Sequence, residues 1–233
     1  LGVLVVSSMA VWCAFRACGG EWSYDASSTT LTYTEGGVDS WKVTPSVSGT
    51  DVTLTAQAGS VAPANGLLDL SGAVEKWNGT LSGCSVAFAD EGTSFASATE
   101  LVLTNATWLT LLKASAGTCF PTLTSFTIGD PSTDLQFGDS SDNSTAPAAS
   151  NGVFNNGGNS TTLNRAVLIG KDVVVKCAFG GCRGLKVVEI AAQGSLTLGS
   201  SAVCIYDGYY GINRVVLSAG GNVSFGYRSF RRS

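Results

Sequence analysis

The sequence predicts a β-rich solenoid, in which short coils of chain stack on one another. A degenerate motif carries this prediction: an apolar residue, two variable residues and then further apolar residues recur at Leu123–Ile128, Leu163–Leu168, Leu185–Ile190 and Ile212–Leu217. The starts lie 40, 22 and 27 residues apart, and periods of about 20 to 30 residues are typical of short-repeat solenoids. The 233 residues include 29 Gly and one Met, which favours strands joined by tight turns over long helices.

Composition and charge narrow the classes of partner. Hydrophobic residues make up 44% of the chain and charged residues 13%, enough for a continuous core. Residues 1–160 carry 14 acidic and 4 basic groups, whereas residues 161–233 carry 9 basic and 3 acidic groups. This asymmetry fits either an acidic partner or a dipole between stacked modules. No basic block is interleaved with aromatic residues, so we expect no nucleic-acid partner.

Residues 1–20 are predicted to be a signal peptide or a lipoprotein-type export segment. The run Leu1–Trp12 is apolar for about the length of a signal-peptide core and too short to span a membrane. Phe15–Gly20 resembles a lipoprotein cleavage site. The protein is therefore expected to be secreted or at the cell surface, with membrane contact only through this segment. The alternative is a buried first strand over residues 3–6.

Residues 21–63 are predicted to form a β-rich cap. Alternating segments at Thr30–Thr34, Trp41–Thr44 and Asp51–Thr55 are separated by turn residues, a pattern typical of antiparallel strands. Solenoids need such caps because a terminal coil otherwise exposes an apolar face and a strand edge.

Residues 64–233 carry the repeats. The last apolar residues of the first strands are Leu70, Leu103, Ile128, Leu168, Ile190 and Leu217. The second apolar pairs are Leu109/Leu111, Leu135/Phe137, Val173/Val175, Leu196/Leu198 and Val223/Phe225, whereas the Leu70 repeat lacks a clear pair. Two short strands per coil are therefore expected, with their apolar sides facing a shared interior.

The repeat pattern is interrupted once and then stops within a unit. Residues 139–162 contain no periodic apolar positions and are predicted to be an inserted loop, either functional or flexible. The pattern also stops within a unit at Phe230–Ser233, so we expect the repeat array to be truncated at its C-terminus.

One unit resembles a known family. The residues Ala178-Phe179-Gly-Gly-Cys182-Arg-Gly-Leu185-Lys-Val-Val-Glu-Ile190 are similar to the repeat of BspA-like, or Treponema-type, leucine-rich repeat surface proteins. Ser201–Cys204 and Tyr227–Phe230 match in part. The resemblance implies a leucine-rich-repeat array with a parallel concave sheet, exported to a cell surface and used for adhesion to host proteins or other cells.

Seven cysteines in an exported protein permit disulfides. Cys84, Cys182 and Cys204 each lie 14 residues after an aligned apolar residue, and Cys119 lies 16 after one. This spacing favours a buried column of reduced thiols over a disulfide framework.

The chemistry needed for catalysis is sparse. Histidine is absent, which removes Ser-His-Asp and Cys-His sites and His-ligated zinc. No nucleotide-binding loop occurs. We expect no enzyme activity, no cofactor and no metal. A carbohydrate-active enzyme built on a β-solenoid is the competing class, because acidic residues such as Asp90 and Glu91 could serve hydrolysis if they converge on a paired carboxylate.

Outward-facing residues of the first strand are the candidate binding residues. The expected outward pairs are Glu100/Val102, Ser125/Thr127, Arg165/Val167, Val187/Glu189 and Arg214/Val216. Arg165, Glu189 and Arg214 then share one face, where they form either a cross-strand salt bridge or a ligand contact. Tyr206, Tyr209 and Tyr210, on a glycine-flanked insertion, either bind a partner or fold back over the coil.

These observations predict a non-enzymatic adhesion or binding protein. Its partner would be an extracellular protein or a cell-surface ligand. The alternative is a structural spacer that carries another domain.

Overall fold

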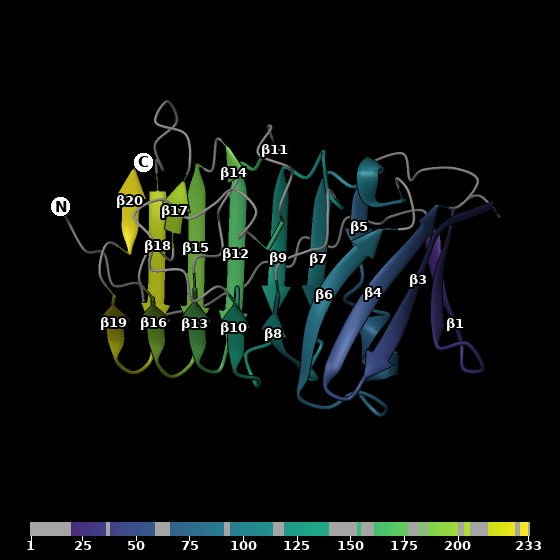
Figure 1. Cartoon of the computed structure of the whole chain (residues 1–233), viewed down its shortest axis with the longest axis horizontal. Coiled ribbons are helices and arrows are strands. Elements are labelled where there is room, and N and C mark those ends of the chain that lie inside the picture. The colour runs from purple at the N-terminus through teal and green to yellow at the C-terminus, as the bar shows by residue number, and fades with distance from the viewer. Residues whose placement is uncertain are drawn as a thin grey trace.

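The fold is a β-solenoid with a small antiparallel part at its N-terminal end. The computed structural model describes residues 20–35, 38–58, 66–90, 94–113, 119–139, 153–154, 161–176, 182–183, 186–199, 203–205, 214–226 and 229–232. Among these residues there are two short 3-10 helices, η1 (Val74–Trp77) and η2 (Ser94–Ser97), and no α-helix. The predicted β-rich solenoid with a parallel sheet is therefore confirmed (Figure 1).

The first side of each coil belongs to a six-stranded parallel sheet. Its strands are β5 (Leu67–Asp69), β7 (Glu100–Thr104), β9 (Ser125–Gly129), β12 (Arg165–Gly170), β15 (Val187–Ala192) and β18 (Arg214–Ala219). They lie side by side in chain order, so each coil adds one strand next to that of the preceding coil (Figure 1).

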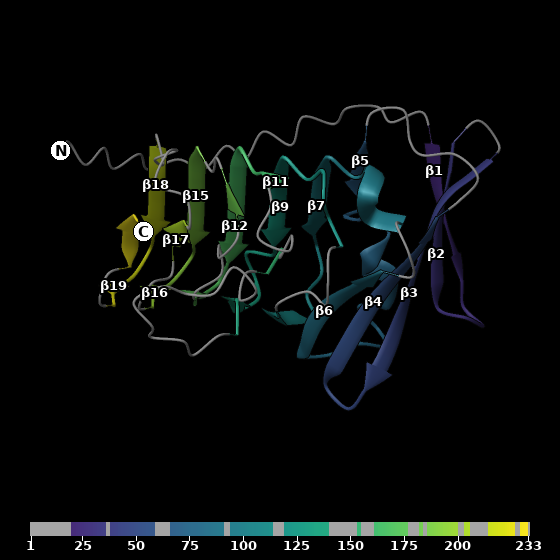
Figure 2. The same cartoon turned by 45° about the horizontal axis from the view of Figure 1, so that its top comes forward.

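The second side belongs to a ten-stranded sheet. Its strands are β1 (Gly20–Asp25), β2 (Thr30–Glu35), β3 (Val38–Ser48), β4 (Asp51–Ala58), β6 (Cys84–Asp90), β8 (Leu109–Leu112), β10 (Leu135–Phe137), β13 (Val173–Val175), β16 (Leu196–Leu198) and β19 (Val223–Phe225). Strands β1 to β4 are antiparallel, and β4 then pairs in parallel with β6. The antiparallel part is thus continuous with the second sheet, and β3 and β4 run obliquely to the coils (Figure 2).

Later coils have a third, shorter side. Strand β11 (Thr161–Thr162) pairs with β14 (Cys182–Arg183), and β17 (Val203–Ile205) pairs with β20 (Phe230–Arg232). Both pairings are parallel, as expected when successive coils repeat the same path.

The interior between the two large sheets is filled by columns of in-register apolar residues. The predicted first-strand column is confirmed, because Leu103, Ile128, Leu168, Ile190 and Leu217 are successive partners in the six-stranded sheet. Leu70 extends this column, since its N–H donates to the Val102 carbonyl at 2.8 Å. The predicted apolar pairs on the second strands are also in register with one another from β10 to β19.

Two predictions about the second strands of the coils were wrong: the buried pair in β8, and the lack of a clear second strand in the Leu70 repeat. In β8 the buried pair is Leu109 and Leu112, whereas Leu111 is only partly buried. A register shift opposite Cys84 and Ser85 inserts one extra residue in β8, which turns Leu111 out of the interior. The Leu70 repeat does have a second strand: it is β6, reached after η1 and a longer connection.

The inserted segment contributes to the core. Most of residues 139–162 lie outside the described residues, but Val153 and Phe154 are buried. The Phe154 ring lies 4.9 Å from that of Phe126 and 5.4 Å from that of Phe120, measured between ring centroids. The Phe88 and Phe137 rings complete a cluster around it. This segment therefore supplies an apolar plug for the interior, which its irregular sequence pattern did not indicate.

Candidate functional site: the outer face of the six-stranded sheet

Outward side chains of the six-stranded sheet form two rows, with one residue from each strand. We call this surface the outer face. The first row is Leu67, Glu100, Ser125, Arg165, Val187 and Arg214. The second row is Asp69, Val102, Thr127, Val167, Glu189 and Val216. The predicted outward positions are confirmed, because side chains alternate between the two faces of a strand and the intervening residues point into the interior.

Arg165, Glu189 and Arg214 lie on three adjacent strands of this face. Glu189 is on β15, between Arg165 on β12 and Arg214 on β18. The Arg165 Nη2 atom is 2.8 Å from Glu189 Oε2, and the two side chains are 51% and 29% exposed. Of the two predicted alternatives, the cross-strand ion pair is thus present between Arg165 and Glu189, and a solvated pair of this kind contributes about 0–1 kcal/mol.

Arg214 is the second exposed basic residue of this group. Its side chain is exposed, and it makes no ion pair with any residue in the described part of the chain. A guanidinium carries five N–H donors in a planar fork that matches a carboxylate or phosphate. Arg214 is therefore the residue of this group best placed to meet an anionic group of a partner.

Charge changes sign along the outer face. Asp69 and Glu100 lie on the first two strands, β5 and β7, whereas Arg165 and Arg214 lie toward the other end. Lys186, which is exposed, directly precedes β15 and adds to the basic end. A ligand with clustered negative charge would be attracted to the last three strands of the sheet.

Several predicted features lie outside the described residues. Tyr206, Tyr209 and Tyr210 are among them, and so are residues 1–19 of the proposed export segment. Most of the family-like motif over residues 178–185 also falls there, apart from the two residues of β14. The roles predicted for these residues stay predictions.

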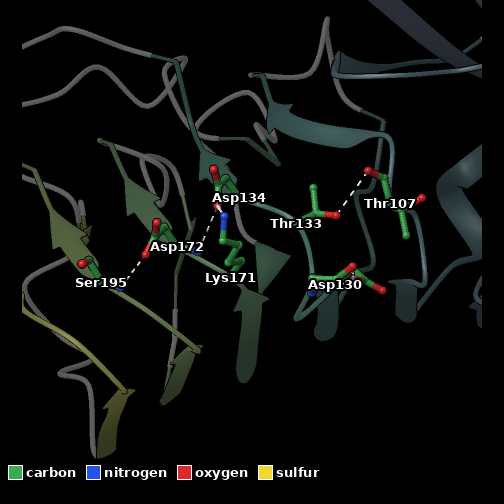
Figure 3. Close-up of polar contacts among 8 residues, drawn as sticks. Thr107, Asp130, Thr133, Asp134, Lys171, Asp172 and Ser195 are labelled. Atoms are coloured by element: carbon green, nitrogen blue, oxygen red, sulfur yellow. Dashed lines mark hydrogen bonds and ion pairs between the residues drawn. The ribbon is translucent and has the colours of Figure 1, made fainter.

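A row of polar residues links successive coils at the turn between the two sheets. Asp134 and Asp172 precede strands β10 and β13, and Ser195 precedes β16 (Figure 3). The Asp172 N–H donates to Asp134 Oδ1 at 3.3 Å, and the Ser195 N–H donates to Asp172 Oδ1. Each carboxylate thus holds the backbone of the next coil, an arrangement that the repeat pattern does not predict. Its signal in the sequence is the short polar residue that directly precedes β10, β13 and β16.

This turn also bears on the carbohydrate-active alternative. Asp134 and Asp172 are carboxylates on adjacent coils, the kind of pair that a glycosidase would use. One oxygen of each accepts a backbone N–H, and Lys171 Nζ lies 3.9 Å from Asp134 Oδ1 (Figure 3). These contacts give both carboxylates a structural role in fixing the turn.

Cys84 and Cys119 are buried free thiols, as predicted. The predicted single column was wrong, because Cys84 pairs with Leu109 in the ten-stranded sheet. Cys182 and Cys204 lie on the third side, opposite Thr161 and Arg231. The first coil is lengthened by η1, so the same offset of 14 residues reaches the second side there and the third side in the shorter later coils.

The described residues contain no group of three or more His, Cys, Asp or Glu arranged to hold a metal ion. They also contain no helix long and apolar enough to cross a membrane. Comparisons with protein-family models, curated proteins and solved structures find no match for this chain.

Proposed function

We propose that the protein is a secreted or cell-surface binding protein whose outer face contacts an extracellular protein or a cell-surface ligand without catalysis. The observation that carries this proposal is the group on β12, β15 and β18. Arg165 and Glu189 are paired with each other, whereas Arg214 presents an exposed guanidinium beside them. A parallel sheet holds the backbone of these residues at fixed spacing, so little backbone conformational entropy is lost when a partner binds.

The chemistry of this face favours an acidic partner surface. Val167, Val187 and Val216 supply small apolar patches between the charged groups. Arginine framed by apolar residues is a common feature of binding hot spots. We also propose that the chain is related to BspA-like leucine-rich repeat proteins. The motif over residues 178–190 and the parallel array of strands support this relationship.

Binding to immobilised extracellular-matrix proteins and to whole cells tests the proposal. Arg214→Ala should weaken binding about ten-fold, equivalent to about 1.4 kcal/mol, because it removes an exposed guanidinium from the contact. Lys171→Ala is the matched control: Lys171 is a basic residue in the turn between the sheets, away from the outer face, and its side chain is 60% exposed. Equal binding by the parent and Arg214→Ala would contradict the use of this face.

The tyrosine insertion needs its own variant. Replacing Tyr206, Tyr209 and Tyr210 together by Ser should weaken binding if these aromatic rings contact the partner. Unchanged binding would remove the tyrosines from the site and leave the outer face as the binding surface. If the parent chain binds none of these surfaces, the spacer interpretation gains support.

A further inference from the structure

The basic end of the outer face spreads its positive charge over three neighbouring strands. Arg165 on β12 and Arg214 on β18 lie in one row, with β15 between them (Figure 1). Lys186 directly precedes β15, and all three basic residues are exposed. Two strand spacings of about 4.8 Å place the Cα atoms of the two arginines about 10 Å apart. These side chains point away from the sheet, so a strand on either side leaves them accessible.

Groups that hydrogen-bond to hydroxyls lie among and beside these cations. Ser125 and Thr127 on β9 are in register with Arg165 and Val167 on β12, and both are partly exposed. Glu189 contacts Arg165 through Oε2 and is 29% exposed, so its second carboxylate oxygen can accept a hydrogen bond from a ligand. A carboxylate only accepts hydrogen bonds, whereas a serine or threonine hydroxyl both donates and accepts.

The rest of this surface favours an extended ligand that lies across the strands. The backbone groups of β9, β12, β15 and β18 are paired within the sheet, so a ligand meets their side chains. The residues between the charged groups are the short side chains of Val167, Val187 and Val216. At the other end of the face, Asp69 and Glu100 would repel an anionic chain, which confines it to the last four strands.

From these features we infer that the basic end of the outer face binds an acidic polysaccharide, a chain that carries carboxylate or sulfate groups together with free hydroxyls. The anions would meet Arg165, Lys186 and Arg214, whose N–H groups donate to them. The hydroxyls would meet Glu189 and the two hydroxyl side chains of β9. An acidic peptide supplies the anions but few hydroxyls, and its carboxylates would be repelled by Glu189. This inference rests on the proposed binding role of the outer face and names the class of its ligand.

Calorimetric titration of the whole chain with two anionic probes tests this ligand class. The probes are a heparin oligosaccharide and a polyglutamate peptide of the same net charge, both at physiological salt. The oligosaccharide should bind at least about ten-fold more tightly, because it satisfies the hydroxyl-binding groups as well as the cations. A smaller ratio, or no binding of the oligosaccharide, would overturn the inference; preference for the peptide would point to an acidic protein instead.

A charge-matched pair of double variants tests the location of the site. Lys186→Ala with Arg214→Ala should raise the dissociation constant for the oligosaccharide at least about ten-fold. Lys76→Ala with Lys171→Ala removes the same charge from exposed residues in the turns between the two large sheets, away from the outer face. This control should change the constant far less. Equal weakening by the two double variants would overturn the inference, because attraction would then depend on net charge alone.

A third double variant tests the recognition of hydroxyls. Ser125→Ala with Thr127→Val should weaken binding of the oligosaccharide about five-fold and leave binding of the peptide unchanged. No loss for the oligosaccharide, or an equal loss for the peptide, would overturn the assignment to a polysaccharide. If cells and matrix proteins are bound in an Arg214-dependent way but the oligosaccharide is not, the proposed function stands and this inference fails.

Discussion

Gly129 occupies a point of very close approach between two coils. Its φ angle is +113°, and a Cβ atom at this position would clash with the Ile169 carbonyl oxygen on the next coil. Neither the left-handed backbone nor the contact with backbone tolerates a side chain. The sequence alone does not single out this glycine among the 29 in the chain, because the restriction arises from the neighbouring coil.

Gly129→Ala should therefore lower the free energy of unfolding by at least about 2 kcal/mol, from backbone strain and the displaced neighbouring strand. Urea unfolding followed by circular dichroism measures this change. Gly72→Ala is the control, because a Cβ at Gly72 would meet nothing within 4 Å. Similar losses in both variants would contradict the close approach.

Asp25 provides a test in the antiparallel part. Hydroxyl groups of Ser27 and Ser28 each donate to its carboxylate at 2.7 Å, and the Ser27 N–H donates at 2.9 Å. These hydrogen bonds, the one from the Ser27 hydroxyl foremost, lower the pKa of Asp25 from 3.8 to about 2. The charged form is favoured in the folded state, so this contribution to stability is present above pH 3.8 and is lost as pH falls through about 2.

An NMR titration of the Asp25 side-chain carboxyl should give a midpoint near 2. Replacing both Ser27 and Ser28 by Ala should move the midpoint upward toward 3.8, because the main donors to the charged form are gone. An ordinary midpoint in the unmodified chain would show that the turn does not hold the carboxylate as described.

Phe154 shows how an irregular segment is tied to regular elements. It is 4% exposed and contacts aromatic rings that belong to four different parts of the array. Phe154→Ala should lower the free energy of unfolding by about 3–5 kcal/mol, because it leaves a cavity between the sheets. Phe225→Ala, at a 58% exposed position, should change it far less. A loss below about 1 kcal/mol for Phe154→Ala would place the segment outside the core.

At the scale of strands, period-two patterns predicted most of the array. The columns through Leu103 and Ile128, and the outward positions of Arg165, Glu189 and Arg214, follow from alternation alone. Features set by contacts between coils could not be predicted in this way. The shift in β8 accompanies the burial of Trp108, whose Nε1–H donates to the Val74 carbonyl at 3.3 Å in the preceding coil.

The cysteine column failed for a related reason. It assumed coils of equal length, but η1 lengthens the first coil and so moves Cys84 to a different side of the solenoid. The ion pair of the candidate site was predictable, because Arg165 and Glu189 are two positions out of register on adjacent strands, within reach of long side chains.

For the whole molecule, the proposed binding surface depends on the in-register stacking of coils. That stacking puts residues far apart in sequence onto one outer face. Arg214→Ala tests the use of this face in binding. The claim on which the face depends is the register of the six-stranded sheet.

The most direct test of that register is the distance between spin labels at positions 102 and 216, measured by pulsed electron paramagnetic resonance. Val102 and Val216 lie in the same outward row, on β7 and β18, with β9, β12 and β15 between them. Four strand spacings of about 4.8 Å predict a backbone separation of about 19 Å. The spin labels are attached to unnatural amino acids introduced at these two positions, because labels that react with thiols would also modify the seven native cysteines. A narrow distribution near this distance would agree with the stacked coils, and one centred at twice that distance would contradict them.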